Sequence, residues 1–200
     1  MRRLSMDADN KKSSIPSDKV KLFEVVKNQT LSKLIRFSWW ESSDAMEQCG
    51  IAQEDVFSLT AGPVLLYFQS GLVVGAASDP AQNSVVVWVE RDDTGYVTDE
   101  PTEKDTDLYT INALDNQYSN SYWSQIVGQN IKMINIIKRD PQNALLAELQ
   151  NEVGVELVMD NGDKFILSHG LHNNSDDFSV ITESYIDRRL LENLRWVNVV

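Results

Sequence analysis

The chain has 200 residues, of which 42% are hydrophobic, and it carries a formal net charge of −12. This length suits one domain with its own hydrophobic core. No apolar run approaches the length of a membrane helix, and no apolar stretch of the kind found in a signal peptide follows the two early arginines. With a single cysteine, Cys49, an intramolecular disulfide is impossible. We therefore expect a cytoplasmic protein without a membrane partner.

The charge is unevenly distributed along the chain. Residues 1–36 hold nine Lys/Arg and four Asp/Glu, whereas residues 37–200 hold nine Lys/Arg and 26 Asp/Glu, a net charge of −17. No Lys or Arg occurs between Arg36 and Arg91. Such a field repels nucleic acid and attracts a basic protein partner. The alternative is that the negative charge only keeps the protein soluble.

The N-terminal region changes character near residue 17. Residues 1–17 are polar and lack periodicity, which predicts a disordered basic arm, so that the folded domain spans residues 18–200. Ser17 and Asp18 can cap a short helix over residues 22–29. The apolar stretch at 31–40 suits a helix face or a strand, and its periodicity does not decide between them.

The next part of the chain has a β pattern. Short apolar runs alternate with the turns Gly62-Pro63, Ser70-Gly71 and Asp79-Pro80, which predicts strands over residues 56–59, 64–69, 72–78 and 84–90. The connections are too short for a parallel crossover. An antiparallel meander is therefore expected.

The C-terminal half continues with mixed patterns. They predict strands at residues 108–114, 132–138, 153–159, 164–170 and 178–182, and helices at 120–130, 143–150 and 185–197. Asn161-Gly162 is a strong hairpin turn. The fold class is thus α+β, a single domain with a mainly antiparallel β-sheet of about six or seven strands and helices packed on one face.

The two hairpins at residues 64–78 and 155–169 resemble each other. Each has an apolar strand, a glycine turn and a second apolar strand. This likeness could record a duplicated meander unit, but stereotyped turn chemistry is the favoured explanation.

No motif for catalysis or phosphate binding is present. The chain contains no GxSxG, GxGxxG or GxxxxGK[ST] pattern, so no cofactor is expected. The cluster most similar to a metal site comprises His169, His172, Asp176 and Asp177. Its spacing is not HExxH, and an exposed polar turn is the favoured interpretation. Cys49 is flanked by carboxylates that disfavour a thiolate, so a structural role is expected.

Two features are candidates for partner binding. Residues 90–107 carry eight Asp/Glu and two Lys/Arg, which predicts an exposed loop that either binds a cationic partner or blunts a sheet edge. The carboxylates available to a partner are Asp92, Asp93, Asp99, Glu100, Glu103, Asp105 and Asp107. Trp40 is a candidate hydrophobic contact beside Trp39, although burial of both tryptophans in the core is the favoured expectation.

The hairpins GPVLLYFQSGLVVG and GVELVMDNGDKFILSHGL, in an acidic α+β domain without a catalytic set, resemble the small immunity proteins that bacteria keep beside secreted toxins. The resemblance concerns general character over residues 56–200 and assigns no functional residue. It implies a non-catalytic binding protein that occludes a basic toxin domain. The alternative function is a metal-dependent or unrecognised enzyme that uses the His169/His172/Asp176/Asp177 cluster.

Overall fold

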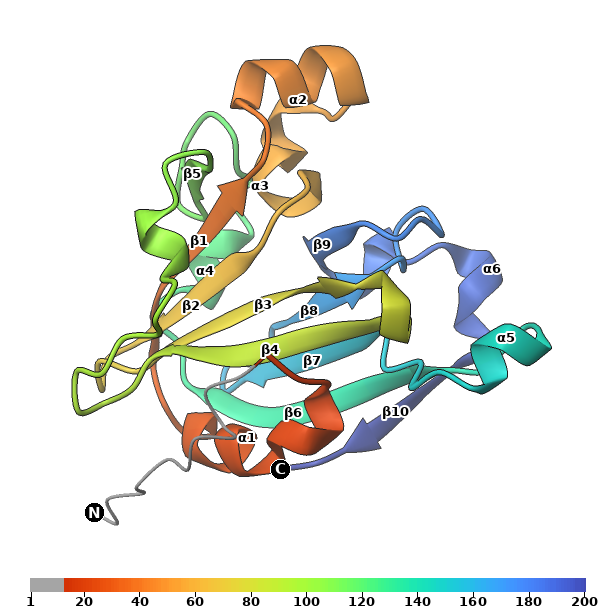
Figure 1. Cartoon of the computed structure of the whole chain (residues 1–200). Helices are drawn as coiled ribbons and strands as arrows, with labels where there is room; N and C mark the ends of the chain where they lie inside the picture. Colours follow the sequence, from red (N-terminus) through yellow and green to blue (C-terminus); the bar gives the residue numbers. More distant parts are fainter. Residues whose placement is uncertain (1–12) are drawn as a thin grey trace.

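The computed structural model describes residues 13–200 and consists mainly of two antiparallel sheets (Figure 1). The first has the strand order β4-β3-β2-β1-β5 and the second the order β10-β6-β7-β8-β9. The strands of the first sheet are β1 Leu31–Ser38, β2 Val64–Phe68, β3 Val73–Asp79, β4 Ser84–Arg91 and β5 Tyr109–Asn112. Those of the second are β6 Ile131–Arg139, β7 Gly154–Met159, β8 Lys164–His169, β9 Phe178–Ile181 and β10 Leu194–Asn198.

The two sheets pack against each other around one main core. Buried residues of both sheets belong to the same apolar cluster, for example Leu34 and Leu66 from the first sheet and Leu157 and Phe165 from the second. This arrangement explains why the strands read as continuous apolar runs, because several also have a covered outer face. The predicted α+β class and the single antiparallel domain are confirmed, with ten strands in two sheets rather than six or seven.

The two sheets repeat the same topology. In each, a hairpin pairs with the first strand, a further strand extends it, and a late strand pairs with the other edge of the first strand. The two repeated units meet where the segments before β1 and β6 exchange matching hydrogen bonds. The backbone N–H of Asn28 donates to the Ile131 carbonyl and that of Gly128 to the Leu31 carbonyl, both at 2.7 Å. The likeness of the two hairpins is therefore part of a repeat of the whole sheet.

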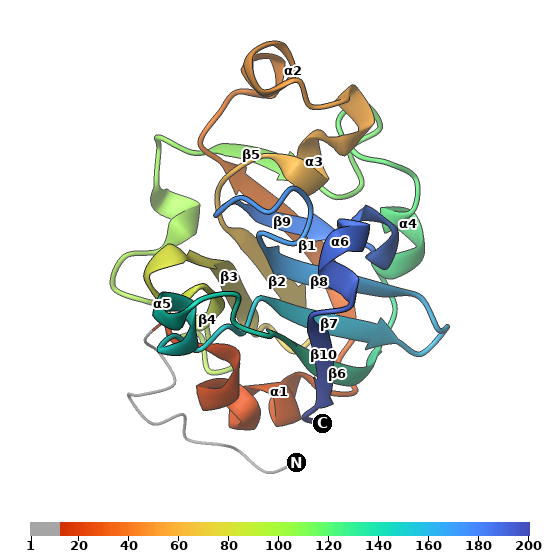
Figure 2. The same ribbon diagram turned by 90° about the vertical axis from the view of Figure 1, so that its right-hand side faces the viewer.

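Short helices occupy the ends and the outer faces of the sandwich. They are α1 Val20–Val26, α2 Ser42–Cys49, α3 Val56–Leu59, α4 Trp123–Ile126, α5 Ala144–Ala147 and α6 Arg188–Leu191. Helix α2 lies at one end of the molecule, whereas α1 and the C-terminus lie at the other (Figures 1 and 2). Helix α6 lies over the outer face of the second sheet, where Leu190 packs with Ile166 (Figure 2). Within residues 13–200 no helix has the length and apolar character needed to cross a membrane.

Three local expectations differ from the structure. Residues 56–59 form helix α3 instead of a strand, and the predicted helix 185–197 is limited to α6 and followed by strand β10. Pairing of β10 with the edge of β6 determines this ending, although the apolar spacing also suited a helix. Residues 13–17 belong to the fold, because Ser14 pairs with Val87 of β4. The rest of the predicted arm, residues 1–12, lies outside the described residues.

Arg36, in β1, is fully buried and holds the β1–β2 connection in place. Its guanidinium donates to the carbonyls of Phe57, Ser58 and Gly62 at 2.9–3.0 Å. Two of these carbonyls belong to α3, so Arg36 satisfies acceptors that such a short helix leaves open. Burial lowers the pKa of Arg36 to about 9, and the side chain stays charged at neutral pH, 5.1 Å from the Phe178 ring.

We expect Arg36→Leu to lower the free energy of unfolding by about 3 kcal/mol or more, because three buried carbonyls lose their donor. Arg91→Leu is the control. Arg91 is partly exposed and pairs with Glu103, so its loss should change stability by less than about 1 kcal/mol. Urea denaturation measures both effects. Equal, small changes for the two variants would contradict the role of Arg36.

Candidate functional site

Trp39 and Trp40 lie at the end of β1 and are both exposed. Their exposed fractions are 64% and 40%, so the expectation that both lie in the core is wrong. The reason is that β1 ends at Ser38 and the chain then leaves the sheet toward α2. The Ser38 hydroxyl contacts both the backbone of Trp40 and the Thr60 hydroxyl, at 2.7–3.0 Å. The exposed tryptophans are therefore held on a fixed backbone.

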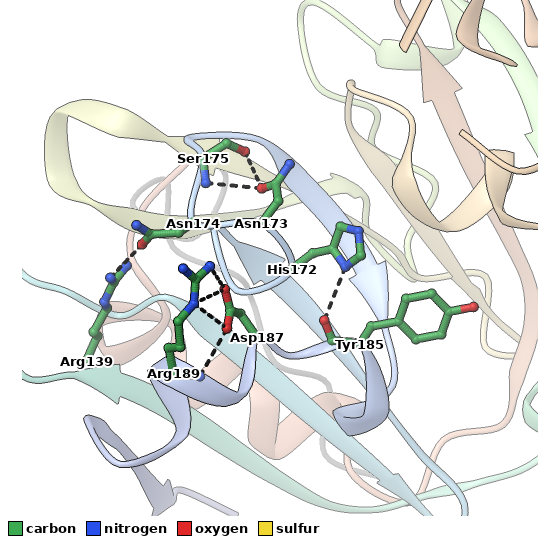
Figure 3. Close-up of polar contacts among 8 residues, drawn as sticks. All are labelled: Arg139, His172, Asn173, Asn174, Ser175, Tyr185, Asp187 and Arg189. Carbon is green, nitrogen blue, oxygen red and sulfur yellow. Dashed lines mark hydrogen bonds and ion pairs between the residues drawn. The ribbon is translucent and has the colours of Figure 1, made fainter. Parts of the chain in front are cut away.

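The loop of residues 170–177 lines the same cavity as Trp40. Hydrogen bonds within this loop and to Arg139 hold it (Figure 3). Gly170 has φ +67°, and a Cβ there would overlap the carbonyl oxygen of Ser175. Arg139 donates to the side-chain oxygen of Asn174 at 2.6 Å, and Asn173 accepts from both the N–H and the hydroxyl of Ser175. This bonding fixes the positions of the side chains that the loop presents.

The chain after β9 supports this loop, and Figure 3 shows its Asp187–Arg189 pair. The backbone N–H of Asp187 donates to the Leu171 carbonyl at 2.9 Å, and the Asp187 carboxylate pairs with Arg189. Hydrogen bonds from Arg189 lower the pKa of Asp187 to about 2. The hydrogen bond from Asp187 to Leu171 therefore connects the start of α6 to the loop.

Tyr185 connects the loop to the β1–β2 connection. Its carbonyl lies 3.1 Å from Nδ1 of His172, and its hydroxyl donates to Oδ1 of Asp55 at 2.6 Å. Burial, together with the hydrogen bond to Asp55, raises the pKa of Tyr185 to about 12. Asp55 and Tyr185 are 130 residues apart in the chain. No local sequence pattern links them, and the sequence did not single out either residue.

These elements enclose a cleft of about 480 Å³, which we call the Trp40 cleft. Residues from positions 40–61 form one side, and His172, Asn173, Asp177 and Tyr185 form the other. This volume lies in the range of small-ligand sites. The cleft brings Trp40 together with His172 and Asp177, two residues of the alternative metal cluster. The exposed thiol of Cys49 also lines it.

A second concave surface, the Trp39 hollow, lies over the outer face of the first sheet. It measures about 560 Å³ and is lined by Trp39, Trp88, Glu100, Lys104 and Asp105, among others. The two adjacent tryptophans therefore line two different concave surfaces.

The acidic loop folds onto the first sheet through its own hydrogen bonds. Asp92 is buried and accepts from the backbone N–H groups of Thr94 and Tyr96. Glu103 accepts from the Tyr67 hydroxyl and pairs with Arg91. The structure thus gives Asp92 and Glu103 partners within the chain.

The other carboxylates of the predicted set are exposed. Glu100 and Asp105 line the Trp39 hollow, and the remaining exposed positions are Asp93, Asp99 and Asp107. These five carboxylates face solvent, and Glu103 is also exposed although it has partners within the chain.

The cluster of His169, His172, Asp176 and Asp177, which was the alternative metal site, is not assembled as one. His169 is buried and its Nε2 lies 3.1 Å from Oδ1 of Asn83, whereas His172 contacts Tyr185. Asp176 is exposed and Asp177 accepts from the Ser175 hydroxyl. Among residues 13–200, no group of three or more His, Cys, Asp or Glu side chains is placed to hold a metal ion.

Comparison of the chain with protein-family models, with curated proteins and with solved structures gives no match. The Trp40 cleft and the Trp39 hollow are therefore the features of this structure that bear on its function.

We expect Gly170→Ala to lower the free energy of unfolding by about 1–3 kcal/mol, because the new Cβ combines backbone strain with a clash. Gly50→Ala is the matched control. Gly50 has nearly the same φ, +66°, but a Cβ there would meet no atom of residues 13–200 within 4 Å. Thermal unfolding should show the larger loss for Gly170→Ala, and equal losses would contradict the packed loop.

His169 gives a pH dependence with a defined sign. Burial lowers its pKa below the usual 6.5, while Asp176, Asp79 and Asp177 partly oppose this effect and Arg139 adds to it. The unfolded chain then takes up the proton more readily than the folded one, so stability falls as the pH drops below about 6.5.

The experiment compares the free energy of unfolding of the wild type with that of His169→Gln between pH 7.5 and 5. The difference in free energy of unfolding between the wild type and the variant should become smaller toward low pH, because the variant lacks this proton uptake. His172→Gln serves as the control at the more exposed histidine. If this difference stays constant between pH 7.5 and 5, the lowered pKa of His169 is contradicted.

Proposed function

We propose that this chain is a non-catalytic binding protein that recognises a basic protein partner through the Trp39–Trp40 surface. We define this surface as the two exposed tryptophans with the Trp40 cleft and the Trp39 hollow. The observation that carries the proposal is that both tryptophans are exposed on a fixed backbone and each lines a concave surface with two carboxylates. Exposed tryptophans beside concave surfaces are typical centres of protein interfaces.

The charge around this surface supports a basic partner. Residues 40–61 contain Glu41, Asp44, Glu47, Glu54 and Asp55 and no Lys or Arg. From the acidic loop, Glu100 and Asp105 line the Trp39 hollow together with Trp39. A surface on which negative charge predominates accelerates encounter with a positively charged partner and disfavours negatively charged ones.

An immunity protein that occludes a basic toxin domain is the form of this function that we favour. Its supports are the acidic character of the chain, the absence of a recognisable catalytic motif, and a surface shaped to receive protruding groups. Such a protein acts through affinity and charge complementarity and does not need to catalyse a reaction.

The test is affinity capture from a lysate of the source cells, at physiological and at severalfold higher salt, with captured proteins identified by mass. We expect one stoichiometric basic partner whose binding weakens at high salt, because screening reduces exposed charge interactions. The double variant Trp39→Ala/Trp40→Ala should bind about tenfold more weakly or worse.

Trp196→Ala is the matched control, because Trp196 has a similar exposed fraction of 37% but lies on β10, away from α2. It should bind as the wild type does. The proposal would be contradicted if the double variant bound a basic partner as tightly as the wild type does. It would also be contradicted if high salt did not weaken binding.

A further inference from the structure

The Trp40 cleft differs from the Trp39 hollow in the charge of its lining. Among the described residues 13–200, its charged lining groups are the carboxylates of Asp55 and Asp177, and none of those residues that line it is Lys or Arg. The Trp39 hollow, by contrast, includes Lys104. Of the two concave surfaces, the Trp40 cleft is therefore the one suited to a cation.

Both carboxylates have one oxygen held by the protein and one left for a ligand. Oδ1 of Asp55 accepts from Tyr185, and Oδ2 of Asp177 accepts from the Ser175 hydroxyl at 2.9 Å. The second oxygen of each accepts no hydrogen bond from the described residues 13–200. Each carboxylate is thus oriented and retains capacity as an acceptor.

His172 adds a further acceptor. Because a carbonyl oxygen can only accept, Nδ1 of His172 carries the proton in its contact with Tyr185. In the neutral ring Nε2, on the far side of the imidazole from that carbonyl, is then an acceptor (Figure 3). The lining therefore offers three acceptors that a donor-rich ligand can use.

The aromatic groups of the cleft select among cations. Trp40 is 40% exposed, and the rings of His172 and Tyr185 lie 5.8 Å apart, centroid to centroid. A guanidinium group is planar, stacks on aromatic faces and carries five donors, whereas an ammonium group is compact and more strongly hydrated. This combination of rings and acceptors fits arginine better than lysine.

We propose that the Trp40 cleft binds the guanidinium group of an arginine side chain that the partner inserts. The identity of the ligand as part of a protein rests on the proposed function; the guanidinium chemistry rests on the cleft itself.

The probe is N-acetyl-arginine amide, titrated into the full chain while NMR follows the indole N–H signals of the tryptophans. The Trp40 signal should shift saturably, and the other tryptophan signals serve as internal references. N-acetyl-citrulline amide, which keeps the shape but lacks the charge, should produce no saturable shift, and N-acetyl-lysine amide should bind several times more weakly.

Asp177→Asn should weaken arginine binding about tenfold, because it removes a charge-assisted acceptor. Asp176→Asn is the matched control, since Asp176 is the neighbouring exposed carboxylate and does not line the cleft. Trp40→Phe keeps an aromatic face and should retain part of the affinity. Because this variant lacks the Trp40 indole signal, its binding is followed through the backbone N–H signals. An unchanged spectrum outside the cleft verifies the fold of each variant.

Equal binding of the arginine and citrulline probes, or equal effects of the two aspartate variants, would overturn the inference. So would saturable shifts with Zn²⁺ alone and none with arginine. The two proposals fail separately. If a partner is captured but arginine does not bind, the proposed function is supported and guanidinium binding in the Trp40 cleft is refuted. If arginine binds but no partner is captured, guanidinium binding is supported and the proposed function is refuted.

Discussion

The buried guanidinium of Arg36 is the interaction on which the candidate surface depends. A charge in a core is costly unless its donors are used, and here they hold three carbonyls of the β1–β2 connection. Around it, Trp123 donates to the Ser58 hydroxyl and packs edge-on against Phe57 and Phe165. This connection carries Trp39, Trp40 and Asp55, so the shape of both concave surfaces follows from how it is held.

The repeated topology explains where function can reside. The two sheets share strand order and exchange matching hydrogen bonds before β1 and β6, and they build one core between them. The connections differ, because residues 39–63 of the first half form α2 and α3 whereas the corresponding connection of the second half is shorter and forms α5. The Trp39–Trp40 surface is made from such unrepeated segments on a rigid, repeated frame.

Local patterns predicted much of the sheet and little of the site. Glycine turns and β-branched runs identified the hairpins, since these signals act over a few residues. They misassigned residues 56–59, because a four-residue apolar run has no distinctive period and Arg36 stabilises the helix from another element. The acidic loop and Trp40 were visible in the sequence. The contact between Asp55 and Tyr185 depends on how the two halves meet, which no local pattern contains.

The most direct measurement is hydrogen–deuterium exchange of the chain with and without the basic protein that we propose as its partner. We expect binding to protect backbone amides in residues 39–61, 92–108 and 170–185, which together form the Trp39–Trp40 surface and its supports. Amides of α1 and β10, at the opposite end, should exchange as they do in the free chain. Protection confined to α1, β10 or the C-terminus would contradict the account, because the partner would then bind away from the exposed tryptophans.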